Sequence, residues 1–320
     1  MTPMEPALRL FGIPDPDLAA VLAAHDAVCR EPSGPLADWV AAVGTTLEGA
    51  MGIPSPGPVL PSRSGLAAGH RETAEAAKPP ETGAEDELAS AVAYLPVVAF
   101  AEALHEAIAF HRRHDVPDSV TTATFADVGR MVERNRLWGG QPGLGDALTG
   151  WLTRHFHGAL FQVGRLQVER VRMTEWSAAR ARQAGVVAQA GDLELTVHIP
   201  AAGGPLTPAA VDDSLGWAHE VVQQAFPQER YVGVSCHSWL LDPQLAEALP
   251  GSNVAAFAGR FVLGSPADED GDLDARRFAF GASSAPFAEL PTGSSLQRAV
   301  VELWRRGGHV QVCSGWLPAR

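Results

Sequence analysis

Apolar residues recur at helical spacing through the first half of the chain. The pattern is clearest in Leu36, Trp39, Val40, Val43 and Leu47, which follow the spacing of an amphipathic helix. The same periodicity predicts helices over residues 16–29, 88–114 and 124–137. We therefore expect residues 1–150 to form a helical N-terminal region.

Residues 52–87 interrupt this pattern. The stretch contains PSPGPVLPSRSG and AAKPPETGAEDE, which combine proline, glycine and charge. Such a composition buries too little apolar surface to offset the entropy lost when the backbone is ordered. The sequence thus predicts a disordered loop near residues 52–87.

Beyond residue 150 the period of the apolar positions changes to two. The run FQVGRLQVERV, residues 161–171, predicts one long strand with a bulge at Gly164 and Arg165. In residues 193–199, apolar positions alternate with Glu194, Thr196 and His198, as expected of a half-buried strand with one polar face. Further strands are predicted at 231–240, near 261 and 278, and in VQVCSGWL. Residues 151–320 are therefore expected to form an α+β or α/β domain around one sheet.

The segment from 193 to 240 has the order strand, glycine loop, helix, strand. The loop reads AAGGPLTP, and the helix that follows begins with the N-cap Thr207 and Pro208. Such a turn presents backbone N–H groups to an anion at a helix N-terminus, and the order predicts a right-handed crossover. This arrangement favours a cofactor that carries phosphate.

Composition narrows the function classes. The chain has 320 residues, 46% of them hydrophobic, and a formal net charge of −13 with Lys78 as its single lysine. That charge opposes attraction to a phosphate backbone, so we expect no nucleic-acid partner. The N-terminus lacks the pattern of a signal peptide, and the longest apolar run is broken by charged residues, so we expect no membrane partner. Three widely spaced cysteines fit neither a disulfide framework nor a zinc site, which indicates a cytoplasmic protein.

Several segments form a recognisable set. They are GRLQVE (164–169), VHIP and PLTP around the glycine loop, CHSWLLDP (236–243), LPGSN (249–253) and SLQRAVVELWRRGGH. Together they resemble a bacterial family of acyltransferase-domain proteins. Members join a helical N-acyltransferase region to a C-terminal domain similar to the GCN5-related N-acetyltransferases. The resemblance implies an α+β fold, with the helical region packed on a mixed β-sheet domain. It also implies acyl-CoA as co-substrate and transfer to an amine or hydroxyl acceptor.

The resemblance also implies a cofactor site. In the GCN5-related fold the pantetheine lies where two neighbouring parallel strands part, and the pyrophosphate rests on the loop after the first strand. By order of elements, these strands are residues 193–199 and 231–240. The implied cofactor contacts are Ile199, Ala201, Gly203, Gly204, Thr207, Ser235, Ser238 and Asn253. Arg260 stands where the superfamily often has a tyrosine.

Direct attack of an amine on a thioester requires a base. An ammonium group with a pKa of about 10.4 costs roughly 4.6 kcal/mol to deprotonate at pH 7. His198 is one candidate, because it ends the polar face of its strand beside the glycine loop and an imidazole suits proton transfer at neutral pH. Glu169 is the second. Two structural alternatives remain: a backbone carbonyl could satisfy His198, and a nearby arginine could pair with Glu169.

Other chemistries remain open at this stage. Cys236 could form an acyl-enzyme, as in a cysteine hydrolase or an acyl-Cys transferase, with His219, His237 or His198 as its base. A noncatalytic acyl-CoA-binding or interaction protein is a further alternative. We predict no metal site, since His105 and His111 are six residues apart rather than the four of a zinc-binding helix. The expected acceptor is an amine on a small molecule or peptide.

Overall fold

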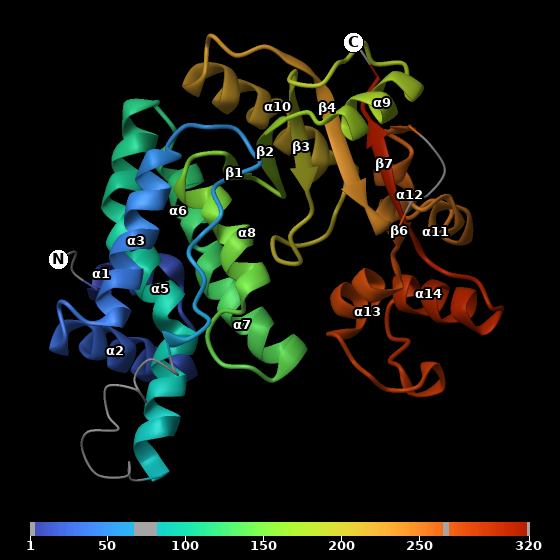
Figure 1. Cartoon of the computed structure of the whole chain (residues 1–320). Coiled ribbons are helices and arrows are strands. Elements are labelled where there is room, and N and C mark those ends of the chain that lie inside the picture. Colours follow the sequence, from blue (N-terminus) through green and yellow to red (C-terminus); the bar gives the residue numbers. More distant parts are fainter. Residues whose placement is uncertain (1–3, 67–81, 265–268, 319–320) are drawn as a thin grey trace. The chain divides into compact units, whose positions relative to one another are not determined.

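The computed structural model describes residues 4–66, 82–264 and 269–318 (Figure 1). The chain forms two compact units. Unit 1 comprises Met1–Ile53, Gly57–Arg113 and Thr121–Ala159, and unit 2 comprises Pro54–Pro56, His114–Val120 and Leu160–Arg320. Helices make up unit 1, and a mixed sheet with helices makes up unit 2, so the expected α+β class is confirmed.

The apolar faces of amphipathic helices form the core of unit 1. Its helices are α1 (Met4–Phe11), α2 (Asp15–Arg30), α3 (Pro35–Gly49), α5 (Thr82–Arg113), α6 (Asp118–Phe125, whose first turn belongs to unit 2), α7 (Asp127–Gly139) and α8 (Asp146–Phe156). The apolar stripe predicted over 36–47 is the buried face of α3, and α1, α2, α3 and α8 all contact α5. The helix predicted over 124–137 is instead divided at Ala126, where α6 ends and α7 begins.

The long helix α5 is the centre of the core of unit 1. Leu95, Val97, Val98 and Phe100 on this helix are fully buried. Among the described residues, only 86–113 form a helix long and apolar enough to cross a membrane, judged by length and composition. A buried core helix meets the same criterion, and 61% of the apolar window is buried. This finding is therefore weak evidence for a membrane span.

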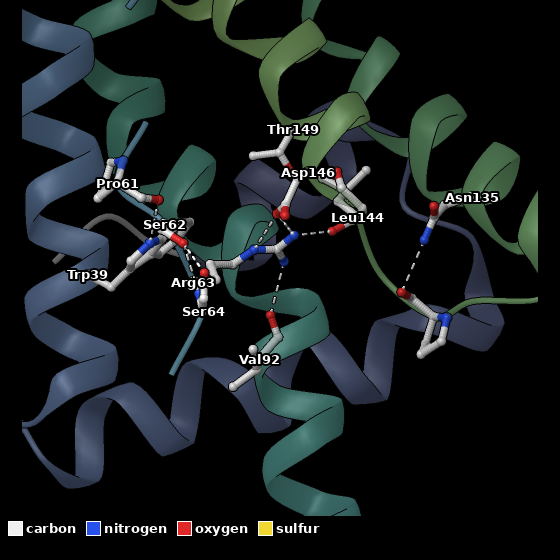
Figure 2. A network of polar contacts seen from close by, with 12 residues as sticks. Trp39, Pro61, Ser62, Arg63, Ser64, Val92, Asn135, Leu144, Asp146 and Thr149 are labelled. Carbon is white, nitrogen blue, oxygen red and sulfur yellow. Dashed lines mark hydrogen bonds and ion pairs between the residues drawn. The ribbon is translucent and has the colours of Figure 1, made fainter. Parts of the chain in front are cut away.

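The segment predicted to be a disordered loop over 52–87 has a defined path at both of its ends. The Arg63 guanidinium donates to the carbonyls of Val92 and Leu144, at 3.2 and 2.9 Å, and pairs with Asp146 (Figure 2). Residues 82–87 belong to α5. Residues 67–81 lie outside the described residues. Composition alone could not reveal that one arginine ties this proline-rich segment to the helices of its unit.

Unit 2 is built on a seven-stranded sheet with the order β1-β2-β3-β4-β7-β5, in which β6 pairs with β7. The strands are β1 (Leu160–Val163), β2 (Leu166–Arg172), β3 (Leu193–His198), β4 (Tyr231–Ser238), β5 (Val262–Leu263), β6 (Glu269–Asp270) and β7 (Gln311–Trp316). The helices are α9 (Glu175–Gln183), α10 (Pro208–Ala225), η1 (Trp239–Leu241), α11 (Pro243–Ala248), α12 (Asn253–Ala258), α13 (Asp272–Phe280), η2 (Phe287–Glu289) and α14 (Ser295–Arg305). Among the strands that the structure describes, only β3 and β4 pair in parallel, and α10 connects them.

Two strand predictions in this half are wrong. Residues 161–171 form the hairpin β1–β2 rather than one bulged strand, because Gly164 takes a φ of +59° and the chain reverses at Gly164 and Arg165. A change of phase in the apolar pattern is typical of both a bulge and a tight turn. The strand expected near residue 278 is part of α13, where Ala275 and Phe280 are buried.

Candidate active site

One face of the sheet in unit 2 carries a row of polar side chains. Side chains alternate along a strand, so Glu194, Thr196 and His198 of β3 point to one face and Leu195 and Val197 to the other. The pairing of β3 with its neighbours places Glu169 of β2 and Ser235 of β4 directly opposite Thr196. We call the side of the sheet that carries these five polar residues the polar face.

The two predicted candidate bases meet on the polar face. His198 Nε2 lies 2.6 Å from Glu169 Oε2, in a hydrogen bond that joins β3 to β2. Glu169 is 5% exposed in its side chain, and His198 is 24% exposed. An imidazole that donates from Nε2 to a carboxylate has its basic lone pair at Nδ1. The pair thus resembles the base and orienting carboxylate of hydrolytic sites, in which the carboxylate fixes the tautomer of the imidazole.

The predicted anion loop follows β3 directly. Residues 201–205, which include Ala201, are exposed, and Gly203 and Gly204 have φ of +96° and +80°, a region that favours glycine. The side chain of Thr207 caps α10, where its Oγ1 accepts from the Ala210 N–H at 3.2 Å. The first turn of this 18-residue helix therefore presents its N–H groups and positive dipole end to the loop.

Arg165 holds this loop in place. Its guanidinium donates to the carbonyls of Pro200 and Gly204, at 2.9 and 2.8 Å. The residue is 9% exposed, and burial lowers the pKa of Arg165. The sequence predicted Arg165 as part of a bulge and as one of the nearby arginines that could pair with Glu169. The loop role was not visible, because it depends on the hairpin turn between β1 and β2.

The pairing between β3 and β4 stops where the cofactor site is predicted. Paired positions run from Leu193 and Tyr231 to Val197 and Cys236, and Ile199 follows the end of β3. Beyond this point β4 continues beside β7 as far as Ser238 and Cys313. The two parallel strands therefore no longer pair after Val197 and Cys236.

The predicted cofactor residues on β4 and beyond have different surroundings. Ser235 Oγ lies 2.9 Å from Thr196 Oγ1 on the polar face, whereas Ser238 is on the opposite face and accepts from the Leu240 N–H. Asn253 is the exposed first residue of α12, which Ser252 caps. Ser238 thus has a structural role in the turn that ends β4.

Arg260 lies beside the start of α10. It donates to the Pro208 carbonyl at 3.0 Å and pairs with Asp212 through both of its terminal nitrogens. Pro208 is the first residue of α10, so this arrangement places a guanidinium next to the helix N-terminus that follows the glycine loop. A phosphate could be bound there by charge, but a guanidinium does not act as an acid.

The structure does not support Cys236 as a nucleophile. The residue is 1% exposed, and burial raises the pKa of its thiol to about 12. Little thiolate is therefore present at neutral pH, and the thiolate is the reactive form. Ser235 and His237 share the polar face with His198, whereas Cys236 points to the other face, away from both histidines.

No group of three or more metal-ligating side chains is found in the part of the chain that the structure describes. The three cysteines, Cys29, Cys236 and Cys313, all lie in the described part of the chain, and none of them is in a disulfide bond. The polar face therefore offers proton transfer and hydrogen bonding as its own chemistry.

The sequence matches the models of two known protein families, one in each half of the chain. Residues 3–158 match the family model of the N-acyltransferase N-terminal domain, and residues 160–317 match that of the GNAT-like C-terminal domain. None of the curated protein sequences matches the chain closely enough to count as a relative.

Solved structures of acyltransferases are similar over nearly the whole chain. An acyltransferase in complex with decanoyl-CoA is 28% identical, with a TM-score of 0.78 over 99% of this chain and 90% of that one. An acyltransferase in complex with CoA and 10C-teicoplanin is 27% identical, with a TM-score of 0.76 over 99% of this chain and 88% of that one.

Proposed function

Since the chain belongs to the family of acyltransferases that join an N-acyltransferase N-terminal domain to a GNAT-like C-terminal domain, we propose that it transfers an acyl group from acyl-CoA to a small-molecule amine. The observation that carries this proposal is the Glu169–His198 pair, which lies at the end of β3 directly before the glycine loop. A base that lies three residues before an anion-binding loop suits a phosphate-bearing thioester.

The proposed cofactor site surrounds the end of β3. The N–H groups of the loop and of the first turn of α10 bind the pyrophosphate, with the predicted contacts at Ala201, Gly203, Gly204 and Thr207. The guanidinium groups of Arg165 and Arg260 flank this region. Arg165 adds positive charge there, whereas Asp212 compensates the charge of Arg260. The pantetheine lies where β3 and β4 cease to pair.

The proposed reaction is direct transfer. Nδ1 of His198 removes a proton from the acceptor ammonium, and Glu169 holds the ring and stabilises the imidazolium that forms. The neutral amine then attacks the thioester carbon and a C–N bond forms. The C–S bond breaks with its electron pair on sulfur, and the second proton of the attacking nitrogen passes to solvent. The neighbours carry decanoyl or octanoyl chains and teicoplanin, which supports a donor of medium chain length and a small-molecule acceptor for this chain too.

The test is release of free CoA thiol from acetyl-, octanoyl- and decanoyl-CoA in the presence of a panel of amines. Wild-type protein should release thiol only when an acceptor is present. His198→Ala should lower kcat by about 10²- to 10⁴-fold, the range of general base catalysis, while calorimetry shows near wild-type affinity for acyl-CoA. An unchanged kcat would remove His198 from the role of base.

A further inference from the structure

A second chain of polar groups lies on the polar face beside the Glu169–His198 pair. Thr196 and Ser235 join their hydroxyl groups across β3 and β4 at 2.9 Å. The Ser235 hydroxyl also hydrogen-bonds to the Glu194 carboxyl group. Trp316 Nε1 donates to Glu194 Oε2 at 2.9 Å. The proposed base mechanism uses none of these four residues.

The chain runs from the interior to a partly exposed side chain. Glu194 is 3% exposed and Ser235 is 5% exposed, whereas Thr196 is half-buried. Burial raises the pKa of Glu194, and the hydrogen bonds from Trp316 and Ser235 act in the opposite direction. The carboxyl group therefore keeps its proton to a higher pH than an exposed glutamate. A buried carboxyl group is thus connected through two hydroxyl groups to the end of the β3–β4 pairing.

Acyl transfer from a thioester needs a proton on the leaving side as well as a base on the attacking side. An ordinary thiol has a pKa of about 8.5, so the departing thiolate takes up a proton at neutral pH. Thr196 and His198 point to the same face, two residues apart, and their Cα atoms are separated by about 6–7 Å along the strand. A base and a hydroxyl donor at that spacing on one face can act on the two sides of a single tetrahedral carbon.

We propose that Thr196, backed by Ser235 and Glu194, protonates the thiolate of CoA as it departs. This inference rests on the proposed function. As the C–S bond breaks, its electron pair stays on sulfur and the Thr196 hydroxyl proton moves to it. The Ser235 proton replaces that of Thr196, and the Glu194 carboxyl proton replaces that of Ser235. Glu194 regains a proton from solvent between turnovers. Both protons that the attacking nitrogen loses, the one that His198 took and the one released as the amide forms, leave to solvent.

The experiment compares two donors that differ in one atom. An acyl-CoA thioester and the selenoester with selenium in place of sulfur present the same acyl chain and nucleotide. Because a selenolate is a much weaker base than a thiolate, its departure needs no proton from the protein. Loss of a proton donor should therefore slow transfer from the thioester far more than transfer from the selenoester.

Thr196→Val is the main variant, since it replaces a hydroxyl by a methyl group of similar size. It should lower kcat for the thioester by about 10- to 100-fold, in the lower range for acid–base catalysis, and kcat for the selenoester by less than about threefold. Glu194 is a positioning residue that acts on Thr196 through Ser235. Glu194→Gln should therefore also lower kcat for the thioester more than kcat for the selenoester. Ser314→Ala is the control, because this buried serine on β7 shares the polar face but hydrogen-bonds to His237. Ser314→Ala should leave kcat unchanged for both the thioester and the selenoester.

The outcomes separate the two proposals. An equal loss of kcat for both donors in Thr196→Val, with an unchanged melting temperature, would overturn the relay alone. An unchanged kcat in that variant would do the same. Failure of the wild-type protein to transfer from either donor would overturn the proposed function, and with it the relay.

Discussion

Both units contain a histidine paired with a buried carboxylate, but only one of the two pairs is open to solvent. In unit 1, Asp127 and His155 lie 3.0 Å apart, and both side chains are 0% exposed. In unit 2, the Glu169–His198 pair is shorter, and the imidazole is 24% exposed. Solvent therefore reaches the second pair and not the first. The same two chemical groups thus stabilise a fold in one place and can perform chemistry in the other.

The surroundings of the two pairs explain this difference. Asp127 accepts hydrogen bonds from Arg130 Nε at 2.7 Å and from Trp151 Nε1 at 3.3 Å. Burial by itself would raise the pKa of Asp127, but the hydrogen bonds and charges of His155 and Arg130 outweigh it and hold that pKa well below its usual range. The pair at His198 is instead next to an exposed glycine loop.

The largest effect on stability is expected in unit 1. Asp127→Asn removes the charge that compensates Arg130 and should lower the free energy of unfolding by about 3–5 kcal/mol, the usual cost of breaking a buried ion pair. Urea denaturation of the variant and the wild type measures this change. Glu169→Gln, at the accessible pair, should cost much less. Equal losses in the two variants would remove the distinction between the pairs.

Activity should respond in the reverse order. Glu169→Gln keeps a side chain of the same size but no longer stabilises an imidazolium, so kcat should fall by about 10- to 100-fold with little change in acyl-CoA affinity. The folded fraction of Asp127→Asn should keep wild-type kcat. Steady-state thiol release with both variants, corrected for folded protein by circular dichroism, makes this comparison. A wild-type kcat in Glu169→Gln would show that the carboxylate does not assist His198.

The sequence predicted each member of the accessible pair but not the pair itself. His198 follows from the alternation in residues 193–199, and Glu169 from the motif GRLQVE. Their contact depends on the antiparallel register between β2 and β3, in which Glu169 is opposite Thr196, and no local sequence pattern reveals that register. The capping of α10 by Thr207 was predicted correctly, because capping is local.

Long-range polar contacts account for what sequence reasoning missed. Arg165 contacts carbonyls that lie 35 and 39 residues away in the chain, and Trp316 reaches Glu194 across 122 residues. Arg63 similarly fixes a segment whose composition predicts disorder. Periodicity and composition describe neighbours along the chain, so they do not reveal such partners.

The acid stability of unit 1 should depend on Asp127. Its pKa is lower in the folded chain than in the unfolded chain, so the unfolded state binds more protons between the two values. The stabilisation is complete above the ordinary pKa of about 3.9 and is lost as the pH falls through the folded value. The difference in melting temperature between wild type and Asp127→Asn should therefore shrink below about pH 4. A constant difference down to pH 2 would contradict this assignment.

The smallest effect is expected at the glycine loop of unit 2. Gly203→Ala forces a residue with a Cβ atom into a φ of +96°, and the strain of about 1–3 kcal/mol should displace the loop and raise the Kd for acyl-CoA several-fold. Gly281→Ala is the matched control, because Gly281 has a φ of +64° at the end of α13 and open space around it. Calorimetric titration should find the wild-type Kd in this control. Similar Kd changes in both variants would indicate general strain rather than a loop that binds the cofactor.

Chemical rescue of His198→Ala tests most directly whether an imidazole at the end of β3 removes the proton of the acceptor. The measurement is the single-turnover rate of acyl transfer from decanoyl-CoA, with and without added imidazole, at constant pH. We predict a slow rate that rises with imidazole concentration and then saturates, while wild-type protein does not respond. A variant that transfers the acyl group at the wild-type rate without imidazole would contradict the account.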